Sequence, residues 1–216
     1  MVEIMQDPAS AGAGKKGDGA KERILAAASI LFAREEYEAC SIRDIAQAAE
    51  VNSALIYYYF GSKEGLLRAL IEEAIGMLAN LLDSLMLKPE MRVREKLRTF
   101  LMAWLGVVAG RGNLKTLMLR TMGTKGSVGD LLRQRIWGNV QRIANILAEG
   151  QLHGELRQGF EPELLAMQVL LCVISPVVGF PFPAKVDVSD SEQRGRYVDS
   201  ALELLFQGIE VRSKDG

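Results

Sequence analysis

The sequence predicts an all-α protein with a small N-terminal helix-turn-helix head and a larger helical body. From Lys21 onward, apolar residues recur at three- and four-residue steps, which is the period of an amphipathic helix. No stretch alternates apolar and polar residues for long enough to form a sheet. Helix-ending signals such as Lys88-Pro89 and the Pro- and Gly-rich segment 179–183 separate the periodic stretches.

The expected elements follow in chain order. A first helix carries Ile24, Ala28, Leu31 and Phe32 on one face. After the head, the apolar period predicts helices at about 63–85, 93–110, 114–121, 128–149, 163–178 and 192–211. The corresponding division of the chain is a disordered, Gly-rich arm over 1–18, a head over 19–64 and a larger helical body over 65–211.

Composition limits the classes of function. Hydrophobic residues make up 49% of the 216, enough for a substantial core. A membrane span needs about 20 consecutive apolar residues, and the sequence has no such run. The first twenty residues lack the apolar centre of a signal peptide, so a cytoplasmic location without a membrane partner is expected.

Histidine and cysteine are too scarce for most metal or catalytic sites. His153 is the single histidine, and it lies in a Gly-containing polar turn. Cys40 and Cys172 are far apart and fit no zinc-binding spacing. We therefore expect no metal, no cofactor and no enzymatic activity.

The segment from Cys40 to Lys63 has the pattern of a helix-turn-helix. Ser41, followed three residues later by Asp44, is a capping-box-like start for a helix over 42–48. A short turn leads to Asn52, the expected N-cap of a second helix over 53–60. Small side chains in the first helix allow the second to cross it closely, as this motif requires.

The second helix contains three consecutive tyrosines, out of five in the chain. Ile56 and Phe60 are four residues apart and are expected to face the core. The outward positions are then Ser53, Ala54, Leu55, Tyr57 and Tyr58. Small apolar groups suit base edges and thymine methyls, and tyrosine hydroxyls suit phosphate oxygens. Lys63, at the start of the next helix, is expected to hold a further phosphate.

These residues resemble the TetR family of regulators. The resemblance runs from about Arg23 through Leu67 and is most specific in the block Val51-Asn52-Ser53-Ala54-Leu55-Ile56-Tyr57-Tyr58-Tyr59-Phe60-Gly61-Ser62-Lys63-Glu64-Gly65-Leu66-Leu67. It implies a three-helix DNA-binding head, a helical ligand-binding body and a homodimer. By position, it places the DNA contacts on Ser41, Arg43, Ser53, Ala54, Leu55, Tyr57, Tyr58, Tyr59 and Lys63.

Two residues depart from the family's pattern. Glu36 follows the first helix, and Glu50 lies in the turn of the motif, at positions where the family usually has glycine. If either backbone is left-handed, the side chain costs about 1 kcal/mol. Between Lys15 and Arg68 there are eight basic and eight acidic residues, so DNA must be bound by a local surface rather than by a general positive field.

The body is expected to supply the dimer interface and an effector pocket. The helix over 163–178 is apolar nearly all round, so one side should pack on its own core and the other on a partner subunit. With the last helix, it predicts a four-helix interface formed by Leu170, Ile174, Val177, Val198, Leu202, Leu205 and Ile209. The candidate pocket residues are Met77, Trp104, Met118, Met122, Trp137 and Met167. Their character favours an apolar or aromatic effector.

These observations predict a homodimeric regulator, a repressor that leaves a pseudo-palindromic operator when it binds a small effector. The sequence is also compatible with two alternatives: a helical carrier of lipids or small molecules, and an architectural DNA binder without a ligand. Cys40 precedes a helix N-terminus, so its thiol is either a redox sensor or a small apolar neighbour of the cap.

Overall fold

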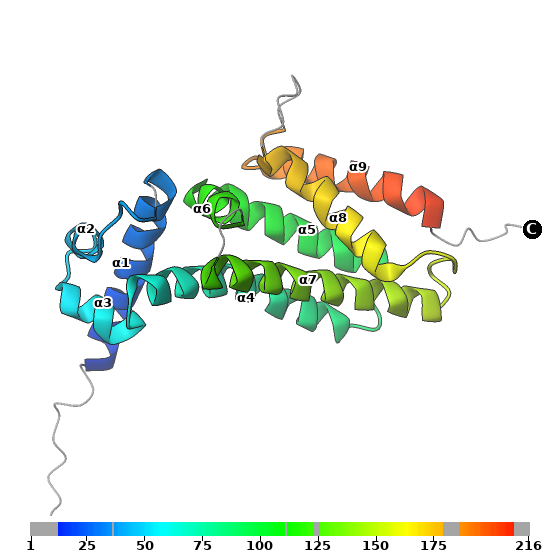
Figure 1. Cartoon of the computed structure of the whole chain (residues 1–216). Helices are drawn as coiled ribbons and strands as arrows, with labels where there is room; N and C mark the ends of the chain where they lie inside the picture. The colour runs from blue at the N-terminus through cyan, green and yellow to red at the C-terminus, as the bar shows by residue number, and fades with distance from the viewer. Residues whose placement is uncertain (1–12, 36, 111, 123–125, 179–185, 210–216) are drawn as a thin grey trace, which may run out of the picture. The chain divides into compact units, whose positions relative to one another are not determined.

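A computed structural model describes residues 13–35, 37–110, 112–122, 126–178 and 186–209 of the chain. Within these ranges every regular element is an α-helix, which confirms the predicted all-α class (Figure 1). The helices are α1 (Ala13–Arg34), α2 (Ile42–Ala48), α3 (Ser53–Phe60), α4 (Lys63–Met86), α5 (Val93–Gly110), α6 (Gly112–Met122), α7 (Ser127–Leu152), α8 (Pro162–Val178) and α9 (Ser191–Ile209).

The chain divides into two compact units, Met1–Leu70 and Ile71–Gly216. We call the first the head and the second the body. In the head, α1 packs against α2 and α3. Its core side chains are fully buried, among them Ile24, Ile45 and Ile56. Helix α4 begins in the head, and its backbone continues without interruption into the body.

Helix α1 is longer than the apolar period indicated. It begins at Ala13, inside the segment expected to be disordered, whereas the periodic pattern starts at Lys21. Its first eight residues include three glycines, which lower helix propensity, together with alanines and lysines, which favour it. A pattern that depends on recurring large apolar residues cannot detect a helical segment whose sequence contains none.

The body has one continuous core of buried apolar side chains. Within it α7 packs against α6 and α8, and α5 packs against α9. Leu97, Phe100 and Leu101 are among its largest fully buried residues. The core also contains a charged group: the Lys96 side chain is 2% exposed, and its Nζ lies 3.2 Å from Oε2 of Glu149. This ion pair joins α5 to α7, and removal of Glu149 would leave the buried Lys96 ammonium uncompensated.

Most of the predicted dimer residues are buried within the single chain. Leu170, Val198, Leu202 and Ile209 are at most 7% exposed, because they already pack in the body's own core. Leu205 is partly buried against the same core. The side chains of Ile174 and Val177 lie outside the described residues. Helical period alone could not show which side of an apolar helix its own subunit covers.

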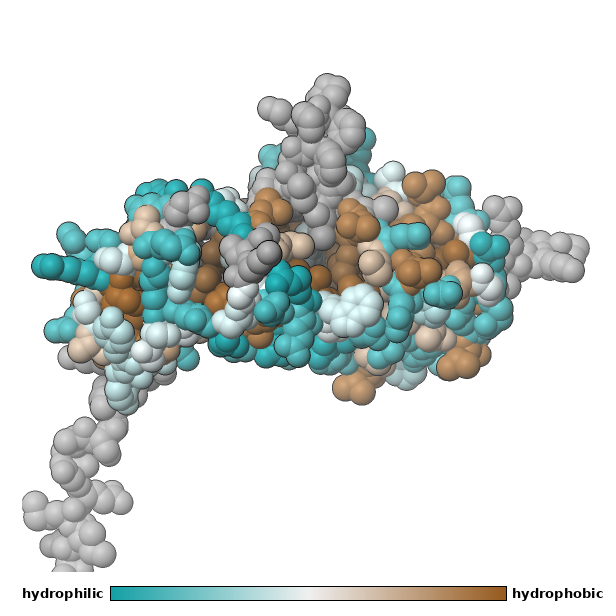
Figure 2. All heavy atoms as spheres, viewed as in Figure 1, coloured by the Kyte–Doolittle hydropathy of each residue, from teal (hydrophilic) through white to brown (hydrophobic). Residues whose placement is uncertain are grey.

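The outward sides of α8 and α9 carry other large apolar residues. On α8, Leu164, Met167 and Leu171 are 54%, 40% and 63% exposed, and their spacing places them along one side of the helix. On α9, Leu204 is 75% exposed. Figure 2 shows apolar surface over these two helices. We call these four residues the outer α8–α9 face. Among the helices that the structure describes, none has the length and apolar character needed to cross a membrane.

Candidate nucleic-acid interface

A reciprocal pair of hydrogen bonds fixes the start of α2. The Ser41 hydroxyl oxygen accepts from the backbone N–H of Asp44 at 3.1 Å, and the Asp44 carboxylate accepts from the backbone N–H of Ser41 at 3.1 Å. This is the capping box that the sequence predicted. The Ser41 hydroxyl also donates to Asp44, and these bonds lower the pKa of the Asp44 carboxyl group. The Ser41 hydroxyl therefore already has a structural role.

The turn between α2 and α3 requires a left-handed backbone at Glu50, where φ is 53°. Glycine, which the TetR family usually has at this position, adopts such a backbone without strain. Two hydrogen bonds hold the turn: Val51 N–H donates to the Ala46 carbonyl at 3.0 Å, and Arg23 Nε donates to the Ala49 carbonyl at 3.2 Å. Glu36, the other departure from glycine, lies outside the described residues.

Helix α3 begins at the expected N-cap and presents an aromatic surface. The Asn52 side-chain oxygen accepts from Ala54 N–H at 2.8 Å, and Ile56 is fully buried against the head core. Tyr57 and Tyr58 are 55% and 79% exposed, and Ala54 is exposed as well. The remaining predicted contacts on this helix are half-buried: Ser53, Leu55 and Tyr59. The ring of Tyr59 packs edge-to-face on Tyr58 at 5.2 Å between centroids.

A tight turn joins α3 to α4. Gly61 has a φ of 73° and donates from its N–H to the Tyr57 carbonyl at 2.9 Å. Gly65 lies so close to the end of α3 that an added Cβ would be 2.0 Å from the carbonyl oxygen of Phe60. Any larger residue at position 65 would therefore push the two helices apart. The close approach of the two helices explains why glycine stands at position 65, which the helical period alone does not explain.

Lys63 has a structural role that the sequence did not predict. Its Nζ donates to the carbonyl oxygens of Tyr37 and, at 2.7 Å, of Cys40. The same ammonium lies 4.2 Å from the centroid of the Tyr37 ring. Lysine has three N–H donors, so two of them are engaged within the head. Phosphate binding by Lys63 stays a prediction, and these internal contacts compete with it.

The environment of Cys40 argues against the redox-sensor hypothesis. Its side chain is fully buried, and burial raises the pKa of the thiol. A protonated, inaccessible thiol is a poor nucleophile. Arg43, by contrast, is exposed on α2, and no ion pair with a carboxylate is found for it in the described part of the head. It therefore has a cationic group available for a phosphate or a base edge.

The predicted effector residues that the structure describes differ in exposure. Met77, Met122 and Met167 are 49%, 43% and 40% exposed, Met118 is half-buried, and Trp104 packs in the body core. Trp137 alone of the six lines a pocket between α4 and α7. The other five do not line this pocket, because period and residue type do not show which side chains face each other. Among the described residues, no cluster of His, Cys, Asp or Glu is arranged to bind a metal ion.

Two short helices with capped N-termini are joined by a four-residue turn, and the second carries exposed aromatic side chains. This is a helix-turn-helix, the motif by which many regulators bind DNA. The family described as "Bacterial regulatory proteins, tetR family" matches residues 24–70. The match covers the head, α1 to the start of α4, so the head resembles the DNA-binding domain of this family.

Individual relatives resemble the chain most strongly over short stretches. The probable HTH-type transcriptional regulator YttP of Bacillus subtilis is 42% identical over 53 residues, which are 24% of this chain and 26% of that protein. The HTH-type transcriptional repressor NicS of Pseudomonas putida is 38% identical over 58 residues, 27% of each chain. The alignments thus span about a quarter of the length of these curated relatives.

One solved structure shares the fold of nearly the whole chain. It is the transcriptional regulator FadR from Bacillus subtilis in complex with stearoyl-CoA. Its TM-score is 0.71 at 24% identity, covering 88% of this chain and 99% of that one. At this identity the similarity establishes the arrangement of helices and no ligand for the present chain.

Proposed function

We propose that the chain is a homodimeric transcriptional repressor that binds a pseudo-palindromic operator through α2 and α3 and is released by a small effector. The observation that carries the proposal is the surface of α3. Tyr57 and Tyr58 are exposed on a helix whose opposite side is anchored by Ile56. Exposed aromatic side chains on a short capped helix are costly to leave in water, and they suit the phosphates and base edges of a major groove.

The proposed DNA contacts fall into two groups. Arg43 and the two exposed tyrosines have side chains directed to solvent, and we assign them the principal contacts. The others contribute backbone groups or partial side-chain surface: Ser41, Ser53, Ala54, Leu55, Tyr59 and Lys63. Phosphate contacts set the position of the helix on the duplex, whereas contacts to base edges select the sequence.

The proposed dimer uses the outer α8–α9 face. Its four residues leave a row of apolar side chains in water, which a second copy of the chain would cover by a two-fold arrangement. Two heads related by a two-fold axis then bind half-sites whose centres are separated by about 34–36 Å or a multiple of it. The operator is accordingly expected to be a pseudo-palindrome.

Repression and effector release rest on two relatives. NicS is named a repressor, and FadR was solved with stearoyl-CoA bound. We infer the same general logic for this chain: an effector that binds the DNA-free form more tightly than the DNA-bound form lowers operator occupancy. At saturating effector, the fold loss of operator affinity equals the ratio of the effector's affinities for the two forms.

Fluorescence anisotropy with DNA fragments, including the region upstream of the protein's own gene, tests the proposal. We expect selective binding of one pseudo-palindrome that weakens steeply as salt rises. Replacement of Arg43 by alanine should reduce the salt dependence by about one unit of slope if Arg43 binds a phosphate. Tyr57→Phe should weaken binding by about threefold to tenfold through loss of a hydroxyl contact.

The matched control is Arg157→Ala, which removes an exposed arginine from the body. It should leave both affinity and salt slope unchanged. If no fragment is preferred over random DNA at any salt concentration, the proposed operator binding is wrong. If Arg43→Ala and Arg157→Ala lower affinity equally, binding depends on net charge rather than on the surface of α2 and α3.

A further inference from the structure

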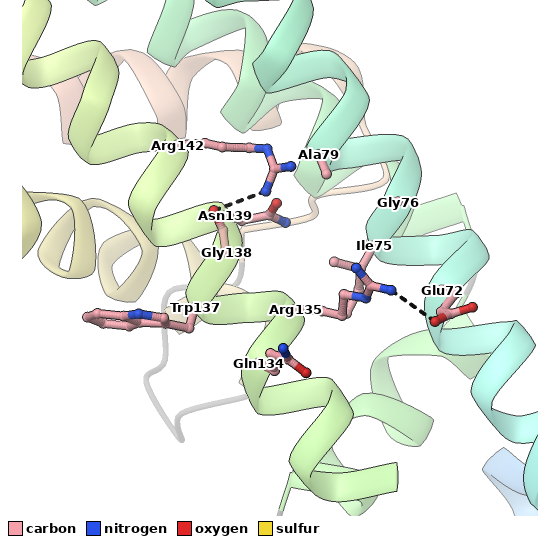
Figure 3. Close-up of a pocket in the computed structure, with 10 residues that line it drawn as sticks. All are labelled: Glu72, Ile75, Gly76, Ala79, Gln134, Arg135, Trp137, Gly138, Asn139 and Arg142. Carbon is pink, nitrogen blue, oxygen red and sulfur yellow. Dashed lines mark hydrogen bonds and ion pairs between the residues drawn. The ribbon is translucent and has the colours of Figure 1, made fainter. Parts of the chain in front are cut away.

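Asn139 is the most unusual polar residue in the body. Its side chain is 6% exposed, and within the described structure its Oδ1 has no hydrogen-bond partner. It lies seven residues after Leu132 and four before Ile143, and both of these are fully buried, so it occupies the inward stripe of α7. A buried carbonyl oxygen without a donor is rare in folded proteins and calls for a missing partner. Figure 3 shows this amide on the side of α7 that faces α4.

The amide opens into a pocket of about 450 Å³ between α4 and α7. The α4 side consists of small or apolar groups, Ile75, Gly76 and Ala79. An added Cβ at Gly76 would meet no atom within 4 Å, so the pocket extends to the backbone of α4. The volume lies in the range of small-molecule sites in proteins, about 300–1,000 Å³.

The charged residues around the pocket compensate one another. Arg135 on α7 lies 3.0 Å from the carboxylate of Glu72 on α4, and Arg142 lies 2.7 Å from that of Asp83. Arg142 also donates to the carbonyl of Gly138 at 3.2 Å, a contact drawn in Figure 3. A cationic or an anionic ligand would meet both signs of charge and would have to compete with these pairs. An uncharged ligand would not.

We propose that this α4–α7 pocket binds an uncharged small molecule that donates a hydrogen bond to Asn139 Oδ1. An apolar part of the molecule lies against Ile75, Gly76 and Ala79, and its donor is a hydroxyl or an N–H group. The proposal assigns this molecule the role of the repressor's effector. That role, unlike the binding itself, rests on the proposed function. Glu72 and Gly76 lie on α4, the helix that begins in the head, so a ligand between α4 and α7 contacts a continuous element of both units.

The pocket differs from the cavity that the sequence predicted. An amide acceptor and two compensated ion pairs surround it, in place of a methionine-rich apolar lining. Trp137 is its single member of the predicted set, and in Figure 3 the indole extends from α7 away from α4. The hydrogen-bond donor, rather than the aromatic character of the ligand, therefore determines selectivity at this site.

Four probes on one ring system test the proposal with the full-length protein. 2-Naphthol is uncharged at neutral pH and has one hydroxyl donor, 2-methoxynaphthalene lacks the donor, 2-naphthoate is an anion, and 2-naphthylmethylammonium is a cation. Calorimetric titration gives the affinity, and the ¹⁵N-edited NMR signal of the Asn139 side-chain amide gives the location. We expect 2-naphthol to bind saturably, to shift that signal and to bind at least about tenfold more tightly than each of the other three.

Three variants connect binding to the pocket. Gly76→Leu adds a side chain whose Cβ meets no atom within 4 Å, so it should abolish 2-naphthol binding and retain the helical circular dichroism spectrum. Asn139→Leu should remove the preference for 2-naphthol over 2-methoxynaphthalene. Asn80→Leu adds leucine at an exposed position of the same helix outside the pocket and should leave binding unchanged.

The outcomes separate the site from the regulator. The proposed ligand site is wrong if 2-naphthol does not bind saturably or if 2-methoxynaphthalene binds equally well. It is also wrong if Gly76→Leu binds 2-naphthol as the unmodified protein does. Anisotropy of the operator complex is measured in the same samples. If 2-naphthol binds through Asn139 and operator affinity does not change, the effector role is wrong although the site stands. If no variant binds an operator with or without 2-naphthol, the proposed repressor fails independently of the pocket.

Discussion

Lys63 Nζ donates a hydrogen bond to the Cys40 carbonyl oxygen across 2.7 Å, and thereby ties the first residue of α4 to the segment that precedes α2. The second donation, to the Tyr37 carbonyl, and the position of the ammonium over the Tyr37 ring strengthen this connection. A lysine that would be assigned to a phosphate by its place at a helix N-terminus thus stabilises the helix-turn-helix itself.

Replacement of Lys63 by methionine should destabilise the head. The variant keeps the aliphatic stem and removes the donors to two carbonyls, so the loss is expected at about 1–3 kcal/mol. Urea unfolding followed by circular dichroism measures it, and hydrogen exchange over 37–63 locates it. Arg43→Ala is the control, with unchanged stability and a reduced salt slope of DNA binding. If Lys63→Met leaves the stability unchanged and reduces the salt slope of DNA binding, Lys63 binds a phosphate instead.

The helices of the head could be predicted closely because their signals are local. Ser41 with Asp44 and the cap at Asn52 specify helix starts within four residues, and the structure confirms both. The role of Lys63 could not be predicted in this way. Its partners lie 26 and 23 residues earlier, and a hydrogen bond to a backbone carbonyl leaves no residue type to recognise.

The body shows the same limit more clearly. On α8, Leu170 is buried and its neighbour Leu171 is 63% exposed, yet the two have the same residue type in the same apolar run. No periodic pattern distinguishes them when a helix is apolar on most sides. The sequence does carry a signal for the pocket, since Asn139 interrupts an inward apolar stripe of α7. The criterion of large apolar side chains, methionine and tryptophan, passes over this asparagine.

Glu50→Gly should stabilise the head and tighten DNA binding. A left-handed backbone favours glycine over other residues, which predicts a gain of about 1 kcal/mol in unfolding free energy. Glu50→Gln separates the two effects, because it removes the negative charge and keeps the side chain at a φ of 53°. We expect tighter operator binding in both variants and greater stability only in Glu50→Gly. A loss of stability in Glu50→Gly would show that another contact of Glu50 outweighs the backbone cost.

Leu171→Glu should dissociate the proposed dimer. A carboxylate on the outer α8–α9 face would be buried without a partner at a two-fold interface, where it would also approach its own copy. Sedimentation velocity should show a shift from dimer to monomer at micromolar concentration. Leu152→Glu, on an 84% exposed leucine at the end of α7, is the matched control and should leave the dimer intact. A dimer in both variants would place the interface elsewhere.

Cys40 should remain unmodified in the folded protein. Burial raises its thiol pKa, so the thiolate fraction at neutral pH is smaller than for a free cysteine. In the variant Cys172→Ser, where Cys40 is the single thiol, iodoacetamide labelling followed by mass spectrometry should proceed only after denaturant is added. Peroxide should accordingly leave operator binding of this variant unchanged. Labelling of native protein at the rate of a free thiol would restore the sensor hypothesis.

The tie between α5 and α9 should be pH-dependent. Arg98 donates to both carboxylate oxygens of Asp199, at 2.6 and 3.0 Å, and these bonds lower the pKa of Asp199 below its ordinary value. The folded state therefore favours the ionised carboxylate. Its contribution to stability is complete above the unfolded-state pKa of about 3.9 and is lost as the pH falls through the lower folded-state pKa.

Asp199→Asn makes that dependence measurable. Both side chains of the pair are about half exposed, 48% for Arg98 and 50% for Asp199, so solvent screening limits the loss at pH 7 to about 0.5–1 kcal/mol. The difference from the unmodified protein should shrink as the pH falls below about 4 and vanish once Asp199 is protonated in both states. Urea unfolding at a series of pH values gives this difference directly, with Glu90→Gln, an exposed loop carboxylate, as the control. If the difference in unfolding free energy stays constant down to the pH at which the body unfolds, the charge of Asp199 contributes nothing. The destabilisation by Asp199→Asn would then be steric.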